Sequence, residues 1–423
     1  MAREMKDSGI AWIGEIPINW ETTKIKYFYD CYDGKRVPVD SAKRKKGPYP
    51  YWGAGSITDY VDSYLFDEEI ILLGEDGAPF FDYTRPVAFL INEKVWVNNH
   101  IHVLKPKETV NSHFLVHYLN NVDYKSYING SILNKLTQSN MNSIAFVVPP
   151  INEQQRIANF LDKECARIDS VIELTRQSIE EYKKLKQSII TEAVTKGIRP
   201  NRPMKDSGIE WIGDIPEDWA RRKLKSFTSI ISKGATPKEM ENEFTIEKPI
   251  RFLKSENIVG NQLSENPLFT IDKETNDNLL KRSQLEKNDI LFVIAGASIG
   301  KVAIMKNHLL PSNTNQAVCF IRMRKEHISK IKFMWYTLQS DLMKTYISIN
   351  SVQSAQPNIS MEDIGNYYIT IPPDNEQKRI ISYLDAKCSE IDNLIANKEK
   401  IITELETYKK SLIYEFVTGK KEV

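Results

Sequence analysis

Residues 149–169 read PPINEQQRIANFLDKECARID, and residues 372–392 repeat this stretch as PPDNEQKRIISYLDAKCSEID, with twelve of 21 positions identical. A second repeated stretch lies closer to the start of each half. Residues 5–20 read MKDSGIAWIGEIPINW and residues 204–219 read MKDSGIEWIGDIPEDW, with twelve of 16 positions identical. Chance does not produce such agreement, so the chain consists of two tandem units of similar plan.

Each Pro-Pro pair marks the start of a long helix, because Pro-Pro is not tolerated inside one. Asn152 or Asn375 then follows as the expected N-cap. Apolar residues recur from there at steps of four and three, the period of a coiled-coil seam. The seam residues are Leu161, Cys165, Ile168, Ile172, Ile179, Tyr182 and Ile189, and in the copy Leu384, Cys388, Ile391, Ile395, Ile402, Leu405 and Leu412. Gly197 and Gly419 are expected to end the helices.

The connection between the helices predicts how they pair. About 44 residues at a rise of 1.5 Å make a helix of roughly 65 Å. The segment between them must leave the C-terminal end of the first and enter the N-terminal end of the second. In a parallel pair those points lie a full helix length apart, more than a domain of about 150 residues comfortably spans. We therefore predict an antiparallel two-helix coiled coil with one globular domain at each end and a pseudo-twofold axis.

The fold class is mixed α/β (α+β), in four parts. A first globular domain spans residues 1–148, a first helix 149–198, a second globular domain 199–371 and a second helix 372–423. Both globular segments have a glycine hairpin between buried strands, with Gly74 and Gly77 matching Gly296 and Gly300. A helix is expected at about 112–128 in the first and 328–349 in the second, before a closing strand.

The WIGxIPxxW motif within residues 5–20 and 204–219 is interpreted as a structural clamp, in preference to a partner contact. It would pack each domain onto the helix ends. One copy follows the first helix and the other begins the chain, so circular symmetry would place both at equivalent junctions.

Composition excludes several classes of protein. The 41% hydrophobic and 27% charged fractions are typical of a folded chain. No apolar run approaches the roughly 20 residues of a membrane helix, and the first residues lack a signal-peptide core, so a cytoplasmic protein is expected. The net charge of +1 gives no sign of nucleic-acid binding, but residues 219–371 hold 21 basic against 15 acidic residues.

Metal sites and disulfides are not expected. The four cysteines show no CxxC spacing, and Cys165 and Cys388, at equivalent repeat positions, are interpreted as core residues. His113 and His117 lie four apart on a predicted helix, as two metal ligands would. HFLVH lacks the glutamate of a zinc-protease motif, so a packed or surface histidine pair is favoured.

Catalytic motifs are also missing from the sequence. The stretch GASIGK at residues 296–301 is one residue short of a phosphate-binding loop, and Val302 replaces the Ser or Thr that would hold magnesium. Paired carboxylates for nuclease metals are not identifiable. The chain is therefore expected to be no enzyme and to hold no cofactor or metal.

Two related but divergent domains on a rigid spacer suit the reading of two short targets at a fixed separation. B-DNA repeats about every 34 Å, and twofold proteins read half-sites one turn apart. A helix pair of the predicted length would place two domains on successive major grooves.

At this point the residues resemble a known family. The paired WIGxIPxxW and PPxNEQxRI motifs, LLGEDGA at residues 72–78 and WVNNHIHVL at 96–104 closely resemble specificity subunits of type I restriction–modification systems. The resemblance covers essentially the whole chain, and the motifs are specific in combination rather than singly. It implies that each variable segment is a target-recognition domain for one part of a bipartite DNA site with an unspecified gap.

The resemblance also implies the partners. These are double-stranded DNA, two methyltransferase subunits bound to the helices and up to two restriction subunits, with no membrane. It implies adenine N6 methylation with S-adenosylmethionine held by the methyltransferase subunit, and ATP and magnesium held by the restriction subunit. Neither Pro-Pro pair of this chain carries the Asn/Asp-Pro-Pro-Tyr/Phe motif of such a methyltransferase.

Candidate DNA contacts follow from how bases and phosphates are recognised. Arg or Lys reads guanine, Asn or Gln reads adenine, acids accept from cytosine, and phosphates need positive charge. In the first domain the candidates are Lys43, Arg44, Lys45, Lys46, Tyr51, Trp52, Glu75, Asp76, Asn98, Asn99, His100, Asn134 and Lys135. In the second they are Arg251, Lys254, Asn257, Ser298, Lys301, Asn313, Asn315, Gln316, Gln353, Gln356 and Asn358.

Structural roles remain open for each of these residues. Asn and Gln commonly cap turns, Tyr51 and Trp52 can be core residues, and the lysine run can be a solvated loop. Two other functions are also considered for the chain: a coiled-coil scaffold that binds only protein, and a self-sufficient enzyme, which would need motifs that the sequence lacks.

Overall fold

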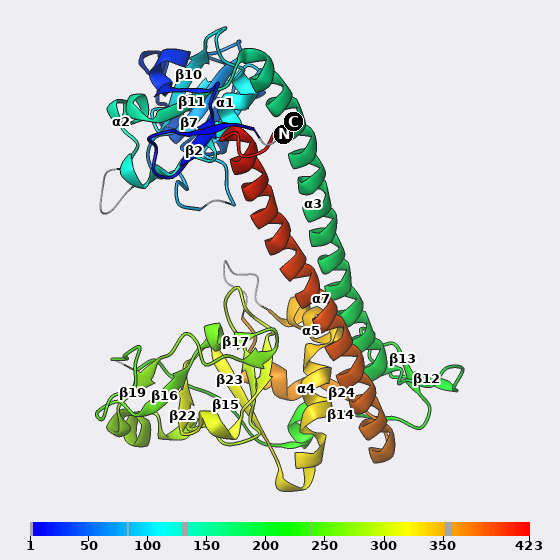
Figure 1. Cartoon of the computed structure of the whole chain (residues 1–423). Helices are drawn as coiled ribbons and strands as arrows, with labels where there is room; N and C mark the ends of the chain where they lie inside the picture. Colours follow the sequence, from blue (N-terminus) through cyan, green and yellow to red (C-terminus); the bar gives the residue numbers. More distant parts are fainter. Residues whose placement is uncertain (1–2, 83, 129–133, 238, 352–357) are drawn as a thin grey trace. The chain divides into compact units, whose positions relative to one another are not determined.

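The chain forms two compact units. The computed structural model describes residues 3–82, 84–128, 134–237, 239–351 and 358–423. The first unit comprises Met1–Gln177 with Asn397–Val423, and the second comprises Ser178–Ala396. Each unit contains a globular mixed α/β domain and a part of each of two long helices (Figure 1).

The two long helices are α3 (Ile151–Thr195) and α7 (Asp374–Val417). Each begins directly after its Pro-Pro pair. Each is followed by a glycine with positive φ, 79° at Gly197 and 73° at Gly419, a conformation that residues with a β-carbon rarely adopt. The predicted helix ends are therefore confirmed.

The expected capping by asparagine is wrong. Asn152 and Asn375 lie inside the first turn, because the preceding proline starts the helical hydrogen bonding. The carbonyl oxygen of Pro150 accepts hydrogen bonds from the backbone N–H groups of both residues 153 and 154, and Pro373 does the same for residues 376 and 377.

Ion pairs between the helices show their direction. In the first unit Asp169 of α3 pairs with Lys409 of α7 at 2.6 Å. In the second unit Lys186 of α3 pairs with Asp392 of α7 at 2.6 Å. The partner's number on α7 falls as the number on α3 rises, which confirms the predicted antiparallel coiled coil.

The predicted seam lies between these helices. Its buried members are Leu161, Cys165, Ile168, Ile172, Ile179, Leu384, Cys388, Ile391 and Leu412. The remaining predicted members are half-buried. Burial raises the pKa of the Cys165 thiol to about 11, so this cysteine is a neutral core residue, as expected from the sequence.

The first domain is built on a four-stranded antiparallel sheet in the order β4-β10-β7-β8. Its strands are β4 (Tyr29–Cys31), β10 (Ile101–Pro106), β7 (Ile70–Gly74) and β8 (Ala88–Ile91). The same domain also contains a three-stranded sheet in the order β6-β5-β9. In it β5 (Tyr49–Trp52) is antiparallel to β6 (Ile57–Val61) and parallel to β9 (Trp96–Val97).

The second domain has the same topology. Its four-stranded antiparallel sheet has the order β15-β23-β20-β21, formed by β15 (Thr228–Lys233), β23 (Val318–Met323), β20 (Ile290–Val293) and β21 (Val302–Ile304). Its three-stranded sheet again has one antiparallel and one parallel pair, formed by β19 (Thr270–Ile271), β16 (Ile250–Leu253) and β22 (Ser312–Thr314). A hairpin of β17 (Ile258–Val259) and β18 (Gln262–Leu263) is added here.

Short strand pairs connect each domain to its helices. The motif hairpins are β1 (Met5–Asp7) with β2 (Glu15–Pro17), and β12 (Met204–Asp206) with β13 (Asp214–Pro216). The closing strands before the Pro-Pro pairs are β11 (Ala145–Val148), paired with β3 (Glu21–Lys24), and β24 (Tyr368–Ile371), paired with β14 (Ala220–Lys223).

The helices of the globular domains are shorter than predicted. In the first domain α1 (Ser112–Leu119) ends well before residue 128, because the side chain of Asn120 turns to the sheet and bonds β8. In the second domain extended backbone at Ser340 divides the predicted helix into α4 (Ile331–Gln339) and α5 (Asp341–Asn350). A short helix precedes each closing strand, α2 (Gln138–Ser143) and α6 (Met361–Asn366).

The tryptophan motifs act as the predicted clamps. Trp20 and Trp219 are buried, and each indole donates a hydrogen bond to the start of its own unit's helix. The acceptors are the carboxylates of Glu153, at 3.0 Å, and Glu376, at 3.2 Å. The tryptophan and the glutamate of this pair occupy equivalent positions in the two repeats.

The helix C-termini meet these clamps as well. A β-carbon at Gly419 would lie 3.0 Å from Trp20, and one at Gly197 would lie 3.1 Å from Trp219. The end of α7 thus reaches the first motif without a covalent link, just as the end of α3 reaches the second through the chain. This confirms the expected circular symmetry of the repeat.

Candidate nucleic-acid interface

Several first-domain candidates line one hollow of about 620 Å³. The lining residues include Arg44, Tyr51, Asn98, Asn99 and His100. Strand pairing brings them together, because β5 and β9 run parallel and end at the same edge of their sheet. The turn that follows β9 therefore lies beside the end of β5, and the N–H of Asn98 donates to the carbonyl oxygen of Trp52 at 3.2 Å.

The two aromatic candidates are structural. Trp52 is 8% exposed and packs against Phe89 in a core cluster, with ring centroids 5.0 Å apart. The hydroxyl of Tyr51 accepts a hydrogen bond from the N–H of Val39, and the guanidinium of Arg44 lies 4.1 Å from its ring centroid. Tyr51 thus shapes the floor of the hollow, and Trp52 does not reach it.

The basic run divides into one fixed and three exposed side chains. Arg44 donates to the carbonyl oxygen of Val39 at 3.0 Å and pairs with Asp59 at 3.3 Å. Lys43, Lys45 and Lys46 on either side of it are exposed. Arg44 lines the hollow, and the three exposed lysines are its neighbours in the sequence.

The two acidic candidates lie in a network of ion pairs beside the hollow. Glu75 pairs with Arg36 at 2.6 Å and with Lys135 at 3.3 Å. Asp76 pairs with His100 at 2.6 Å and with Lys135 at 3.7 Å. The acids are only 13% and 16% exposed, whereas Lys135 and His100 are 46% and 51% exposed. The cations, rather than the acids, face outward.

Beneath this network lies a buried histidine that the candidate set omits. His102 is 1% exposed, with Nδ1 2.6 Å from Asp33 and Nε2 2.8 Å from the carbonyl oxygen of Leu136. Burial tends to raise the pKa of Asp33, but the hydrogen bond and charge of His102, helped by Val103 and Arg36, hold that pKa below its usual range. A polar residue inside the apolar run IHVL was the available sequence signal.

The same cluster was tested as a metal site. Asp33, Glu75 and His102 offer ligand atoms within 4.8 Å of one another. However, both ring nitrogens of His102 already face acceptors, and Arg36 contacts both carboxylates, at 2.6 and 3.4 Å. The guanidinium of Arg36 takes the place of a cation between the two carboxylates, so the arrangement fits an ion-pair network.

The second domain brings a matching set of loops together. β16 and β22 are parallel, so Lys254 and Asn315 follow strand ends at one edge, as Asn98 does in the first domain. The turn of Asn315 and Gln316 leads to Ala317, whose carbonyl oxygen accepts from Ile294. Ser298 and Lys301 belong to the loop between β20 and β21, and this loop joins antiparallel strands, whereas a phosphate-binding loop leads into a helix.

Three second-domain candidates have internal roles. Asn257 is 1% exposed and its amide donates to the carbonyl oxygens of residues 264 and 267. Asn313 is fully buried and donates to Asn276 and to the carbonyl oxygen of residue 280. Arg251 is 9% exposed and bonds Glu265. We leave these three out of the proposed interface.

The remaining candidates lie before the short helices α2 and α6. Asp76 and Lys135 form an isolated antiparallel bridge, and Ala295 and Asn358 form the corresponding bridge in the second domain. The segment of Asn134 and Lys135 and that of Asn358 therefore occupy equivalent places in the two domains. Gln353 and Gln356 lie outside the described residues.

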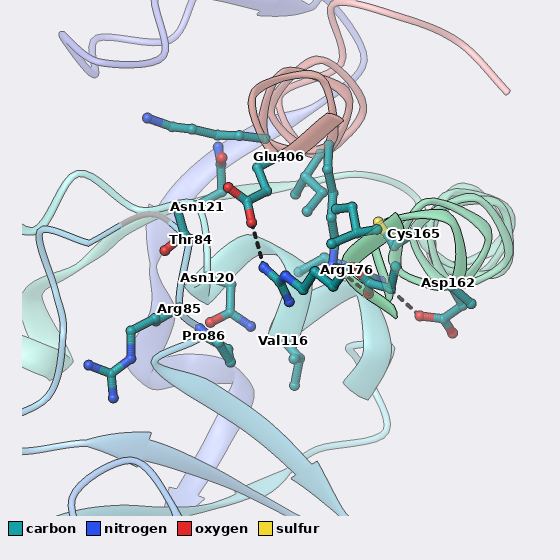
Figure 2. A pocket seen from close by; sticks show the side chains of 17 residues that line it. Thr84, Arg85, Pro86, Val116, Asn120, Asn121, Asp162, Cys165, Arg176 and Glu406 are labelled. Carbon is teal, nitrogen blue, oxygen red and sulfur yellow. Dashed lines mark hydrogen bonds and ion pairs between the residues drawn. The ribbon is translucent and has the colours of Figure 1, made fainter. Parts of the chain in front are cut away.

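A second hollow of the first unit, about 460 Å³, lies where the globular domain meets α3 and α7 (Figure 2). Its central polar groups are already paired. Arg176 bonds Glu406 at 2.9 Å, Lys409 bonds Asp169 at 2.6 Å, and Asn120 accepts two backbone hydrogen bonds. This hollow belongs to the joint between domain and helices.

The histidine pair on α1 is part of that joint. Nδ1 of His113 and Nε2 of His117 each lie 2.7 Å from a different oxygen of Asp162 on α3. The hydrogen bond from His117 lowers the pKa of Asp162, against the opposing effect of burial. The packed or surface histidine pair favoured from the sequence is thus found, with His117 packed and His113 exposed.

Among the described residues no helix combines the length and the apolar character that a bilayer span requires.

Comparisons with known proteins agree with this architecture. The profile described as "Type I restriction modification DNA specificity domain" matches residues 17–184 and 216–407. The MjaVIII specificity subunit of Methanocaldococcus jannaschii is 27% identical over 96% of this chain and 94% of its own length. The EcoBI specificity subunit of Escherichia coli is 25% identical over 79% of this chain and 71% of its own length.

A solved structure supports the fold. That structure is described as the structural basis of complex assembly and conformational transition of the type I R-M system. It superposes on this chain with a TM-score of 0.66. That chain is 15% identical, and the match covers 96% of this chain and 99% of that one. With the family profile matching most of both repeats, the chain belongs to the type I restriction–modification DNA specificity family.

Proposed function

We propose that this chain reads a two-part DNA sequence for a type I restriction–modification complex and has no catalytic activity of its own. One observation carries the proposal: two domains of identical strand order bear different polar residues at matched loop positions. Identical frameworks with divergent loops are what two readers of different short targets require. A scaffold that binds only protein has no need of this divergence.

The first-domain surface combines the two kinds of contact that DNA recognition uses. Lys43, Lys45 and Lys46 supply exposed positive charge for phosphates, which positions a duplex. The hollow of the same domain presents Asn99 and His100, whose side chains are exposed at the start of a rigid strand. Phosphate contacts next to fixed polar side chains are the arrangement of a base-reading site.

Methyltransferase subunits would dock on the long helices. α7 exposes Leu394, Ile401 and Tyr408 at seven-residue spacing, along one flank of the seam. α3 exposes Val171 and Leu185, which are the repeat equivalents of Leu394 and Tyr408. Exposed apolar stripes mark interaction surfaces. Two equivalent stripes suit two copies of one partner, and restriction subunits would join through that core.

The chemistry would reside in these partners. The chain's own residues position DNA, and S-adenosylmethionine, ATP and magnesium would be bound by the methyltransferase and restriction subunits. The chain would work in the compartment that holds the DNA, the cytoplasm of a prokaryotic cell.

Domain exchange tests the proposal. Residues 20–148 are replaced by those of another family member, the complex is assembled with its partner subunits, and methylated adenines are mapped by sequencing. Only one half of the methylated motif should change. The matched control exchanges residues 219–371 and should change only the other half. A change in both halves, or in the gap, from either exchange would contradict the one-domain, one-half assignment.

A further inference from the structure

The two isolated bridges identify one equivalent position in each domain. Each bridge joins the loop after the central strand, β7 or β20, to the segment before the short helix, α2 or α6. The bridge of the first domain joins Asp76 to Lys135, and the bridge of the second domain joins Ala295 to Asn358. The outer members, Lys135 and Asn358, are exposed.

Backbone hydrogen bonds fix this position without using its side chain. In the first domain the N–H of Leu136 donates to Glu75 at 2.7 Å, and the N–H of Gly77 donates to Asn134 at 3.1 Å. In the second domain the N–H of Ile359 donates to Ile294 at 3.0 Å. A side chain mounted this way can change chemically while its α-carbon stays in place.

In the first domain the exposed cation at this position, among the described residues, is the ammonium of Lys135, a hydrogen-bond donor. The carboxylates of Glu75 and Asp76 are largely buried and are paired with Arg36, His100 and Lys135. The groups left facing out are the ammonium of Lys135 and the ring of His100. The major-groove edge of guanine, with acceptors N7 and O6, is the complement of such an ammonium donor.

The second domain replaces this charge with an amide. Ala295 stands where Asp76 stands, so no carboxylate needs neutralising, and Asn358 stands where Lys135 stands. An asparagine side chain offers one donor group and one acceptor, which is the complement of adenine N6 and N7.

We propose that Lys135 and Asn358 are the equivalent base-reading residues of the two domains, an inference that rests on the proposed function. Lys135, with His100 beside it, selects a guanine in one half of the target. Asn358 selects an adenine in the other half. Glu75 and Asp76 are positioning residues that hold Lys135 and His100, and they do not themselves read cytosine.

The test uses the full chain assembled with its methyltransferase subunits, with methylated adenines mapped by sequencing. Lys135→Ala should lower discrimination at one guanine of one half-site by roughly ten- to hundredfold, leaving the other half and the gap unchanged. Lys135→Asn should convert that preference toward adenine. Asn358→Ala should relax one position in the opposite half. Lys94→Ala, which removes an exposed lysine of the same domain paired with Asp67, is the matched control and should leave the motif unchanged.

Uniform weakening across all sequences with an intact motif would mean that Lys135 contacts phosphate, and would overturn the proposal. An unchanged motif in Lys135→Ala, or a change in the half read by the second domain, would also overturn it. Thermal unfolding of each variant identifies misfolding, and Lys135→Arg, which keeps the donors, should retain the guanine. Failure of the proposed function looks different, because the unmodified complex would then show no sequence-specific methylation.

Discussion

His102 shows how a single buried residue holds the candidate interface in shape. Both of its ring nitrogens face oxygen acceptors, one on Asp33 and one on the backbone of Leu136. A carboxylate and a carbonyl oxygen are both acceptors, so the ring is held from both sides. It connects the turn at residue 33, the strand β10 and the segment that carries Lys135.

His102→Gln should therefore loosen this part of the domain. A neutral amide cannot satisfy both acceptors or balance Asp33, so the free energy of opening β10 should fall by about 1–3 kcal/mol at pH 7. Amide hydrogen exchange of β10 measures this local opening. Unchanged protection of β10 would show that the histidine is not needed to hold the strand.

The pH dependence of this effect has a defined sign. The pKa of Asp33 is lowered in the folded domain, so its contribution to stability is present above its unfolded pKa of about 3.9. The contribution is lost as the pH falls through the folded pKa. The difference between wild type and His102→Gln should therefore be smaller at about pH 3.5 than at pH 7. A difference that grows in acid would contradict the assignment.

Residue chemistry in the sequence pointed to several loops, and the structure brings two of them together. The turn of Asn98 to His100 and the segment of Lys135 meet through the ion pairs of Asp76. Asn257 and Asn313 had the right side chains for adenine, but burial decides their role, and burial depends on strand neighbours far away in sequence. Arg36, Asp33 and His102 were not among the residues predicted from the sequence. Their role depends on their contacts with one another, and these contacts are formed only in the fold.

At the scale of elements, one aspartate of the repeat joins each globular domain to its long helix. Asp162 on α3 accepts hydrogen bonds from His113 and His117 of α1. Its repeat equivalent, Asp385 on α7, bonds two α4 residues with the same spacing of four. These are Lys332, at 2.6 Å, and Tyr336, at 2.7 Å.

The joint keeps its acceptor and varies its donors. The aspartate belongs to the repeated helix, and the donors belong to the divergent domains. In Figure 2 the labelled Asp162 points from α3 toward the hollow where domain and helices meet. A new globular domain would therefore fit the same helix if its first helix presents two donors four residues apart.

Asp162→Asn should weaken this joint. The amide keeps the shape of the side chain but loses the charge, so the docking of α1 should lose on the order of 1 kcal/mol, since Asp162 is partly exposed. Amide hydrogen exchange of α1 should become faster while that of α4 is unchanged. Asp385→Asn should make exchange of α4 faster and leave α1 unchanged. The double change of His113→Lys and His117→Tyr, which copies the second joint, should keep α1 protected. Asp67→Asn, an exposed carboxylate paired with Lys94 at 3.6 Å, is the control.

The elements illustrate where periodicity succeeds and where it stops. Both long helices and their antiparallel pairing followed from Pro-Pro, the seam and the connection length, because each is a local or geometric constraint. The breaks after Leu119 and at Ser340 did not follow. They depend on Asn120 bonding a strand and on Ser340 adopting extended backbone, and neither leaves a mark in the apolar pattern.

At the scale of the whole molecule, we expect the length of the coiled coil to set the spacing of the two halves of the DNA target. α3 and α7 pair antiparallel, so a heptad removed from one helix must be matched in the other to keep the seam aligned. Seven residues correspond to about 10 Å of helix, or roughly three base pairs of B-DNA. Both globular domains and both clamps would be left intact by such a change.

Deleting residues 172–178 together with residues 395–401, which are equivalent in the repeat, should therefore shorten the unspecified gap and leave both half-site sequences unchanged. Each deletion removes one heptad and restores the seam, since Ile168 is again followed by Ile179 at heptad-compatible spacing. Sequencing of methylated adenines from the assembled complex gives the gap directly. Deleting residues 172–178 alone is the control and should abolish specific methylation, because the unmatched helix loses its seam register. A methylated motif with an altered half-site after the double deletion, or an unaltered gap, would show that the helices do not set the spacing.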